Sequence, residues 1–195
     1  MYQGPPIDDH EILAWVPAEL RRLLERVNGY VAYDGGLHLR GACTAPEWHS
    51  LRAAWTGPDA LHRLFPAVRP DDVPFAEDAL GDQYLARNGV VHRLSAETGE
   101  VESLEMDLPA FDEAVRADPV EALSLHPLEE FRARGGVLEP GELLSVYPPF
   151  VAAESAEGVT YRAVPAGERI RWLAELARSI ADLPEGGRLE IIPRP

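Results

Sequence analysis

The apolar positions near the start of the chain recur with the period of an α-helix. Leu20, Leu23, Leu24 and Val27 follow Pro17 at spacings of three and four residues, which places them on one helix face. Asn28-Gly29 then supplies a stop signal. Similar patterns predict further helices at 48–55, at 108–115, from Asp118-Pro119 onward, at 127–134 and at 173–183.

The clearest β pattern lies in the middle of the chain. Gln83–Arg87 and Val90–Leu94 are separated only by Asn88-Gly89, the favoured pair for a two-residue hairpin turn. Glu97-Thr98-Gly99 then turns the chain into a strand from Val101 to Met106. The sequence therefore predicts a three-stranded meander. Further strands are predicted at 37–40, 143–147, 160–164 and 189–192.

Prolines interrupt the segment before this meander. Phe65-Pro66, Arg69-Pro70 and Val73-Pro74 fall between Leu64 and Asp78. Each proline removes a hydrogen-bond donor and restrains the residue before it. We therefore expect an ordered loop over 64–78.

These elements predict an α+β fold of one domain, with a central, mostly antiparallel sheet flanked by helices. The 195 residues suit a single domain, and no internal repeat divides them. Residues 1–15 form an N-terminal segment in this interpretation, and residues 140–195 form a C-terminal extension that packs on the same domain.

The charge balance changes the range of possible partners. The chain has 33 acidic residues and 18 basic ones, all of them arginine, for a net charge of −15. Such a surface repels phosphate backbones and anionic lipids, so direct nucleic-acid and membrane binding are not expected. The absence of lysine excludes Schiff-base chemistry and the phosphate-binding lysine of a P-loop.

The N-terminal residues lack a signal-peptide pattern, and no apolar stretch is long enough to span a bilayer. The chain has one cysteine, which excludes an internal disulfide. A cytoplasmic location is therefore expected.

Motifs for catalysis or metal binding are incomplete. His10-Glu11 begins a zinc-protease pattern, but Ala14 stands where the second histidine is required. Cys43 lies near the cation of Arg40, which is a common arrangement and weak evidence for a reactive thiol. The histidines are scattered, so a metal site would need ligands from distant segments. We expect no enzymatic activity, no metal and no cofactor.

Negative charge is concentrated in one tract. Between Pro70 and Val115, twelve acidic residues and two arginines give −10 of the total −15. This tract is a candidate face for a basic protein partner, and solubility alone is an equally good explanation. The candidate partner-binding residues are Asp71, Asp72, Glu77, Asp78, Glu97, Glu100, Glu102 and Glu105.

The order of several motifs is similar to that of a known family. These motifs are Asn28-Gly29, Gly35–Leu39, Pro74–Leu85, the hairpin, and Glu97–Glu100. The chain resembles the SUKH superfamily of the Smi/Knr type from about Pro17 to Ile192. Gly81-Asp82, ahead of a hydrophobic strand, is the most specific element. Val16 stands where the family pattern has a leucine, and the part after Pro140 is longer than in small members.

The resemblance implies an α+β fold with a central sheet and a non-catalytic protein-binding function. Many bacterial members resemble immunity proteins that neutralise a cognate toxin, and fungal members regulate cell-wall assembly. We therefore expect an immunity-type protein that occludes a basic toxin domain, for example a nuclease. A regulatory or scaffold protein is the alternative, and an enzyme with an unrecognised site is a third hypothesis.

The family supplies no catalytic residues to transfer. Gly81 is expected to allow an unusual backbone angle, and Asp82 to hydrogen-bond local amides at the start of the strand. Asn88 and Gly89 are likewise expected to have a structural role.

Overall fold

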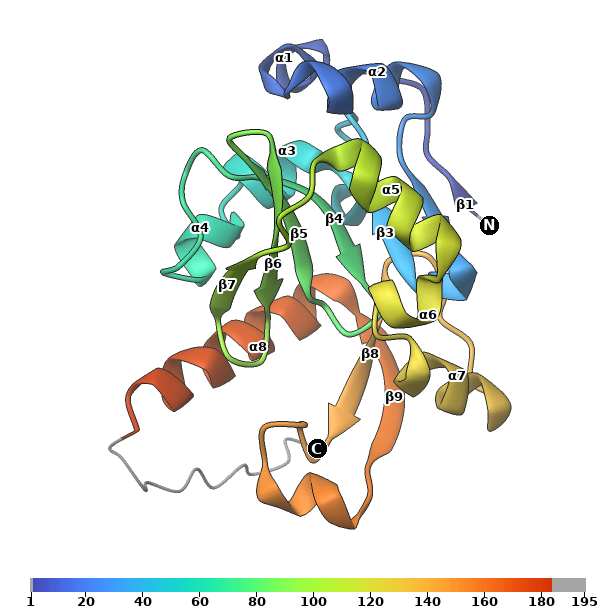
Figure 1. Cartoon of the computed structure of the whole chain (residues 1–195), viewed down its shortest axis with the longest axis vertical. Helices are drawn as coiled ribbons and strands as arrows, with labels where there is room; N and C mark the ends of the chain where they lie inside the picture. The colour runs from blue at the N-terminus through green and yellow to red at the C-terminus, as the bar shows by residue number, and fades with distance from the viewer. Residues whose placement is uncertain (1, 184–195) are drawn as a thin grey trace.

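The centre of the fold is a seven-stranded antiparallel sheet whose strands lie side by side in sequence order (Figure 1). The computed structural model describes residues 2–183. The strands are β1 (Tyr2–Gln3), β2 (Tyr30–Ala32), β3 (Leu37–Leu39), β4 (Val73–Asp78), β5 (Gln83–Arg87), β6 (Val90–Ser95) and β7 (Glu100–Ser103). A separate antiparallel pair consists of β8 (Glu142–Tyr147) and β9 (Thr160–Pro165).

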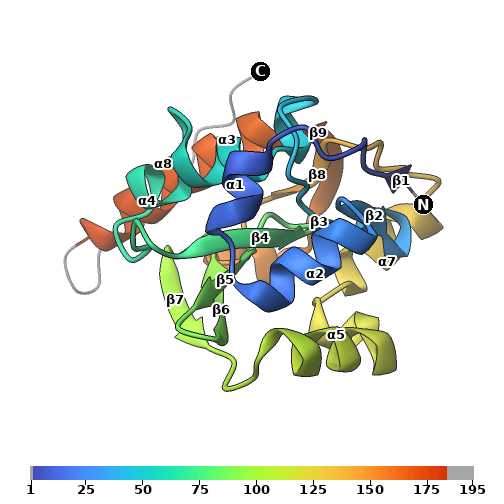
Figure 2. The ribbon, with the colours of Figure 1, turned by 90° about the horizontal axis from the view of Figure 1, so that it is seen from above.

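Helices lie on both faces of the large sheet. They are α1 (His10–Trp15), α2 (Ala18–Arg26), α3 (Leu51–Thr56), α4 (Leu61–Leu64), α5 (Leu108–Ala117), α6 (Pro119–Ala122), α7 (His126–Ala133) and α8 (Ala166–Ala181), with 3-10 turns η1 (Tyr33–Gly35), η2 (Glu47–His49) and η3 (Ala153–Glu157). Figure 2 shows α2 and α5 on one side of β4, and α3, α4 and α8 on the other. The predicted α+β class is thus confirmed.

The predicted meander is also confirmed. Strands β5 and β6 pair in register from Gln83 with Leu94 to Arg87 with Val90, and β7 follows as the next antiparallel neighbour. Asn88 and Gly89 have backbone φ angles of 51° and 80°, the left-handed values that a tight hairpin turn of this kind requires. The local sequence Asn88-Gly89 therefore specifies the turn between β5 and β6.

The prediction of a loop over 64–78 is wrong at its end. Val73–Asp78 forms β4, which lies between β3 and β5 and is buried throughout. Pro74 fits because the register of β4 against β5 shifts between Pro74 and Ala76, and such bulges accommodate a residue that has no N–H to donate. The proline marks an irregularity in a central strand.

The part of the C-terminal extension that the structure describes packs on the same core. The amide of Leu144 in β8 donates to the Ala79 carbonyl oxygen at 2.7 Å. Helix α8 contributes Leu173 and Ala174 to a cluster that also contains Leu85 and Leu94 of the sheet. The strand predicted at 189–192 lies outside the described residues. Between residues 2 and 183, no helix is both long and apolar enough to cross a membrane.

Candidate functional site

Three of the eight acidic residues expected on a partner-binding face are buried within the fold. The exposed fractions of Asp72, Glu77 and Asp78 are 1%, 3% and 2%. The carboxylate of Asp72 forms a two-pronged ion pair with Arg87, with N–O distances of 2.6 and 2.7 Å. The expectation that these three residues form an exposed face is therefore wrong, because Glu77 and Asp78 lie on the central strand β4 and Asp72 lies directly before it.

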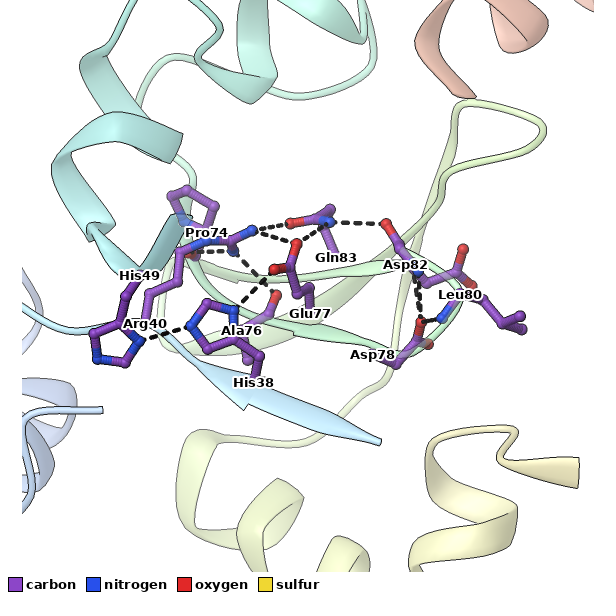
Figure 3. Close-up of polar contacts among 11 residues, drawn as sticks. His38, Arg40, His49, Pro74, Ala76, Glu77, Asp78, Leu80, Asp82 and Gln83 are labelled. Atoms are coloured by element: carbon purple, nitrogen blue, oxygen red, sulfur yellow. Dashed lines mark hydrogen bonds and ion pairs between the residues drawn. The ribbon is translucent and has the colours of Figure 1, made fainter. Parts of the chain in front are cut away.

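Glu77 is the centre of a buried polar cluster that joins β3, β4 and β5 (Figure 3). Its Oε1 atom lies 2.8 Å from His38 Nδ1. Its Oε2 atom accepts hydrogen bonds from Arg40 at 2.7 Å and from Gln83 at 3.0 Å. Both carboxylate oxygens are thus occupied by partners from the neighbouring strand segments.

Arg40 is equally well satisfied. Beside Glu77, its guanidinium donates to the Gln83 side-chain oxygen at 2.7 Å and to the Pro74 carbonyl oxygen at 3.0 Å. A buried charge is stable only when it is paired and hydrogen-bonded. The Glu77–Arg40 pair meets this condition.

A line of imidazoles continues the cluster toward the N-terminal segment. His38 Nε2 lies 2.8 Å from His49 Nδ1, and His49 Nε2 lies 3.1 Å from the Asn28 carbonyl oxygen. When Glu77 is ionised and both rings are neutral, the two rings supply two protons for the three contacts with Glu77, between the rings, and with Asn28. One contact of His49 then has no proton, so a third proton would complete the line.

Burial opposes the uptake of that proton. It lowers the pKa of His38, although the hydrogen bond to Glu77 acts in the other direction. Burial lowers the pKa of His49 to about 4, although the Asn28 carbonyl oxygen opposes the shift. Burial alone would raise the pKa of Glu77, but the Arg40 charge and the His38 hydrogen bond hold it at about 2. At neutral pH the cluster therefore contains an ionised Glu77 and two neutral imidazoles.

The turn between β4 and β5 confirms one structural expectation and corrects another. Gly81 has a φ angle of +99°, as expected for a glycine chosen for its backbone freedom. Asp78, not Asp82, caps the local amides, because its Oδ1 accepts from the amides of Leu80, Gly81 and Asp82. Asp82 instead accepts from the Ala96 amide at 2.8 Å, which connects this turn to the end of β6.

Glu97 is also used within the fold. Its carboxylate oxygens accept from the backbone amides of Phe150 and Val151 at 3.3 and 3.1 Å. The contacts hold the loop after β8 against the turn between β6 and β7. Glu97 is therefore a weaker candidate for partner binding than its position in the acidic tract indicates.

The remaining four candidates, Asp71, Glu100, Glu102 and Glu105, are exposed. Glu100 and Glu102 lie on β7, the last strand in the sheet order, and Glu105 follows directly after it. We call Glu100, Glu102 and Glu105 the acidic edge. Asp71 lies just before β4 and is separated from the acidic edge by β5 and β6.

Two features hold the acidic edge in place. Glu102 forms an ion pair with Arg93 of β6 at 2.7 Å. Glu105 has a φ angle of 56°, which is uncommon for a residue other than glycine, and its amide donates to the Ser103 hydroxyl oxygen at 3.2 Å. The carboxylate of Glu105 is thus presented from a constrained turn.

The structure also places the other residues that the sequence singled out. Cys43 is fully buried, and burial raises its pKa to about 11, so its thiol is not activated. Among residues 2–183, no cluster of three or more His, Cys, Asp or Glu side chains could hold a metal ion. The alternation of Leu37-His38-Leu39-Arg40 put His38 and Arg40 on one strand face, but nothing local indicated that His49 and Glu77 would meet them.

No protein-family model and no curated protein match the chain. Among solved structures, the chain is similar to Atu4351 from Agrobacterium tumefaciens, at 13% sequence identity and a TM-score of 0.48. The match covers 90% of this chain and 84% of that one. A likeness this distant carries no inference about function.

Proposed function

We propose that the chain is a non-catalytic protein-binding module that engages a basic protein through the acidic edge. The observation that carries the proposal is the place of these residues in the sheet. Within residues 2–183, β7 pairs on one side only, with β6, and Glu100 and Glu102 are exposed on it. An edge strand presents backbone donors and acceptors to a partner, and here it combines them with negative charge.

The contrast with the buried acids supports this choice. Asp72 and Glu77 are neutralised by arginines inside the fold. Neither Glu100 nor Glu105 forms an ion pair with any described residue, so their charges act on the solvent side. Exposed charges of one sign accelerate encounter with a partner of the opposite sign.

We further propose that the partner is a toxin domain, which this protein neutralises by covering its basic active surface. The support is the resemblance of the motif order to immunity proteins of the SUKH superfamily, together with the acidic edge. A regulatory or scaffold role of the Smi/Knr type is the alternative. A toxin gene beside the gene for this chain would favour neutralisation, and a gene neighbourhood without one would favour the regulatory role.

The decisive experiment is a stopped-flow measurement of association with the toxin domain encoded by such a neighbouring gene. The variant carries Glu100→Gln and Glu105→Gln. The control is Glu175→Gln, which neutralises an exposed carboxylate on α8. We expect association of the native protein to slow as salt rises, and the double variant to associate several-fold more slowly at low salt.

Two outcomes would contradict the proposal. One is an association rate that is equal for the native protein, the double variant and the control. The other is a double variant that associates normally but forms oligomers on its own. Charges on an edge strand also prevent sheets from pairing with one another, so that second result would assign them a protective role.

A further inference from the structure

A cavity between α2, α5 and the sheet lies on the other side of the fold from α8 (Figure 2). It has a volume of about 660 Å³, which falls in the range of small-molecule sites. Helices α2 and α5 form its walls, and β2, β3 and β4 form its floor. Figure 2 shows α2 and α5 side by side beneath this end of the sheet.

The interior of this cavity is apolar. Leu23 and Val27 come from α2 and its end, Phe111 and Val115 from α5, and Phe75 from β4. An extended hydrocarbon group could contact all of these side chains at once. Such contacts favour an apolar ligand without selecting its charge.

The polar residues of the cavity lining include Arg26, Tyr30, Tyr33, Asp112 and Arg116. We call these five the mouth of the cavity, because Arg26, Tyr33 and Arg116 are exposed to solvent. Arg116 forms an ion pair with Asp112 at 2.9 Å. Arg26, an exposed residue, has no ion pair or side-chain hydrogen bond within residues 2–183. The mouth therefore carries one positive charge in excess, on a chain whose net charge is −15.

Tyr30 lines the same cavity as Arg26 and Arg116. Burial raises the pKa of its phenol, as does the Asp112 carboxylate, whereas Arg116 and Arg26 lower it. A hydroxyl and two guanidiniums are donors suited to an oxyanion.

We propose that this cavity binds a small amphiphile with a single anionic head and an apolar body. The head group pairs with Arg26 and Arg116 at the mouth, and the apolar body lies against Leu23, Phe111 and Val115. This inference is independent of the proposed protein-binding function, because the acidic edge lies on β7 at the far side of the sheet from β2.

The test compares three probes with the same chain: octanoate, octanol and octylamine. Each is titrated into the full-length protein, and binding is followed by NMR through the backbone amide shifts of α2 and α5. We expect octanoate to bind most tightly and octylamine most weakly. Lengthening the carboxylate from hexanoate to octanoate should tighten binding by about four-fold per CH₂, the gain typical of burying a methylene.

The variant Arg26→Gln and its control Arg22→Gln locate the head group. Both residues are exposed arginines on α2, but only Arg26 lines the cavity. Loss of a charged hydrogen-bond donor should weaken octanoate binding by about 10-fold in Arg26→Gln, with no change in Arg22→Gln. Octanol binding should be the same in both variants.

Three results would overturn the proposal. Octanoate and octanol could bind equally well, which would make the cavity a crevice without head-group recognition. Both arginine variants could weaken octanoate binding to the same extent, which would indicate general attraction to basic residues. The amide shifts of α2 and α5 could also remain unchanged over the whole octanoate titration.

Discussion

Strands β4 and β7 both take acidic residues from the same tract of sequence, yet they use them in opposite ways. Glu77 on β4 is buried between two strands and is bound to Arg40 at 2.7 Å. Glu100 on β7 is exposed at the edge of the sheet. The position of a strand in the sheet therefore decides whether a carboxylate stabilises the fold or remains available to a partner.

The energetic conditions of the two strands differ accordingly. A buried charge costs several kcal/mol of lost hydration unless a partner offsets the loss. A charge at the edge keeps its hydration and contributes little to stability. A count of charges along the sequence does not distinguish buried carboxylates from exposed ones. For this chain, that count therefore overstates the negative charge on the surface.

The sharpest test of this contrast is Glu77→Gln. The substitution keeps the shape of the side chain but leaves Arg40 as an unpaired buried charge. We expect it to lower the free energy of unfolding by about 3–5 kcal/mol, measured by urea denaturation. Glu100→Gln is the matched control, with an expected change within about 0.5 kcal/mol. Equal changes in the free energy of unfolding of the two variants would show that the buried carboxylate on β4 stabilises the fold no more than the exposed carboxylate on β7.

The imidazoles beside Glu77 predict a dependence of stability on pH. The pKa of His49 falls from 6.5 to about 4 on folding, so the unfolded chain binds more protons between these values. The contribution of His49 to stability should be complete above about pH 6.5 and should be lost as the pH falls toward 4, by roughly 3 kcal/mol. The depressed pKa of Glu77, about 2 against 4.5, continues the decline below pH 4.5. The raised pKa values of the buried Asp78 and Asp82 act in the opposite direction.

Two measurements check this pH dependence. Urea denaturation at a series of pH values gives the stability, and an NMR titration of the His49 ring gives its pKa directly. A His49 midpoint at or above 6.5 would mean that the ring takes up the third proton of the line, against the effect of burial.

Gly81 and Gly89 allow the cost of a positive φ angle to be measured apart from the cost of crowding by neighbouring atoms. Gly81 and Gly89 have φ angles of +99° and +80°. A Cβ atom at Gly81 would lie 3.0 Å from a Leu173 methyl group, whereas one at Gly89 would have no atom within 4 Å. We expect Gly89→Ala to cost about 1 kcal/mol and Gly81→Ala about 2–3 kcal/mol, measured by thermal unfolding. Equal losses of stability in the two variants would show that the close approach of Leu173 to position 81 adds no cost.

The smallest expected effect on stability concerns Glu105. Its φ angle of 56° favours glycine, so Glu105→Gly should leave stability unchanged or raise it by up to about 1 kcal/mol. The same variant should slow association with a basic partner, because one charge of the acidic edge is lost. A clear loss of stability would instead give Glu105 a role in the fold.

The sequence by itself determined the elements whose structure depends on neighbouring residues. The Asn88-Gly89 turn sets the register of β5 and β6 because a two-residue hairpin leaves one geometry open. Helices α2 and α5 follow from amphipathic spacing and from their boundary residues. The meander and the α+β class could be predicted from these local signals, and so could the backbone role of Gly81.

Only the tertiary structure decided which acidic residues are buried and which groups meet. Arg40 and Glu77 are 37 residues apart in the chain, and their pairing requires β3 and β4 to lie side by side. Strand β4 could not be predicted because Pro74 lies within it and lacks an N–H donor. The bulge that accommodates this proline forms only when β4 pairs with β5 in the sheet. The His38–His49 contact and the cavity between α2 and α5 depend in the same way on segments that are distant in sequence, since burial and proximity are properties of the packed chain.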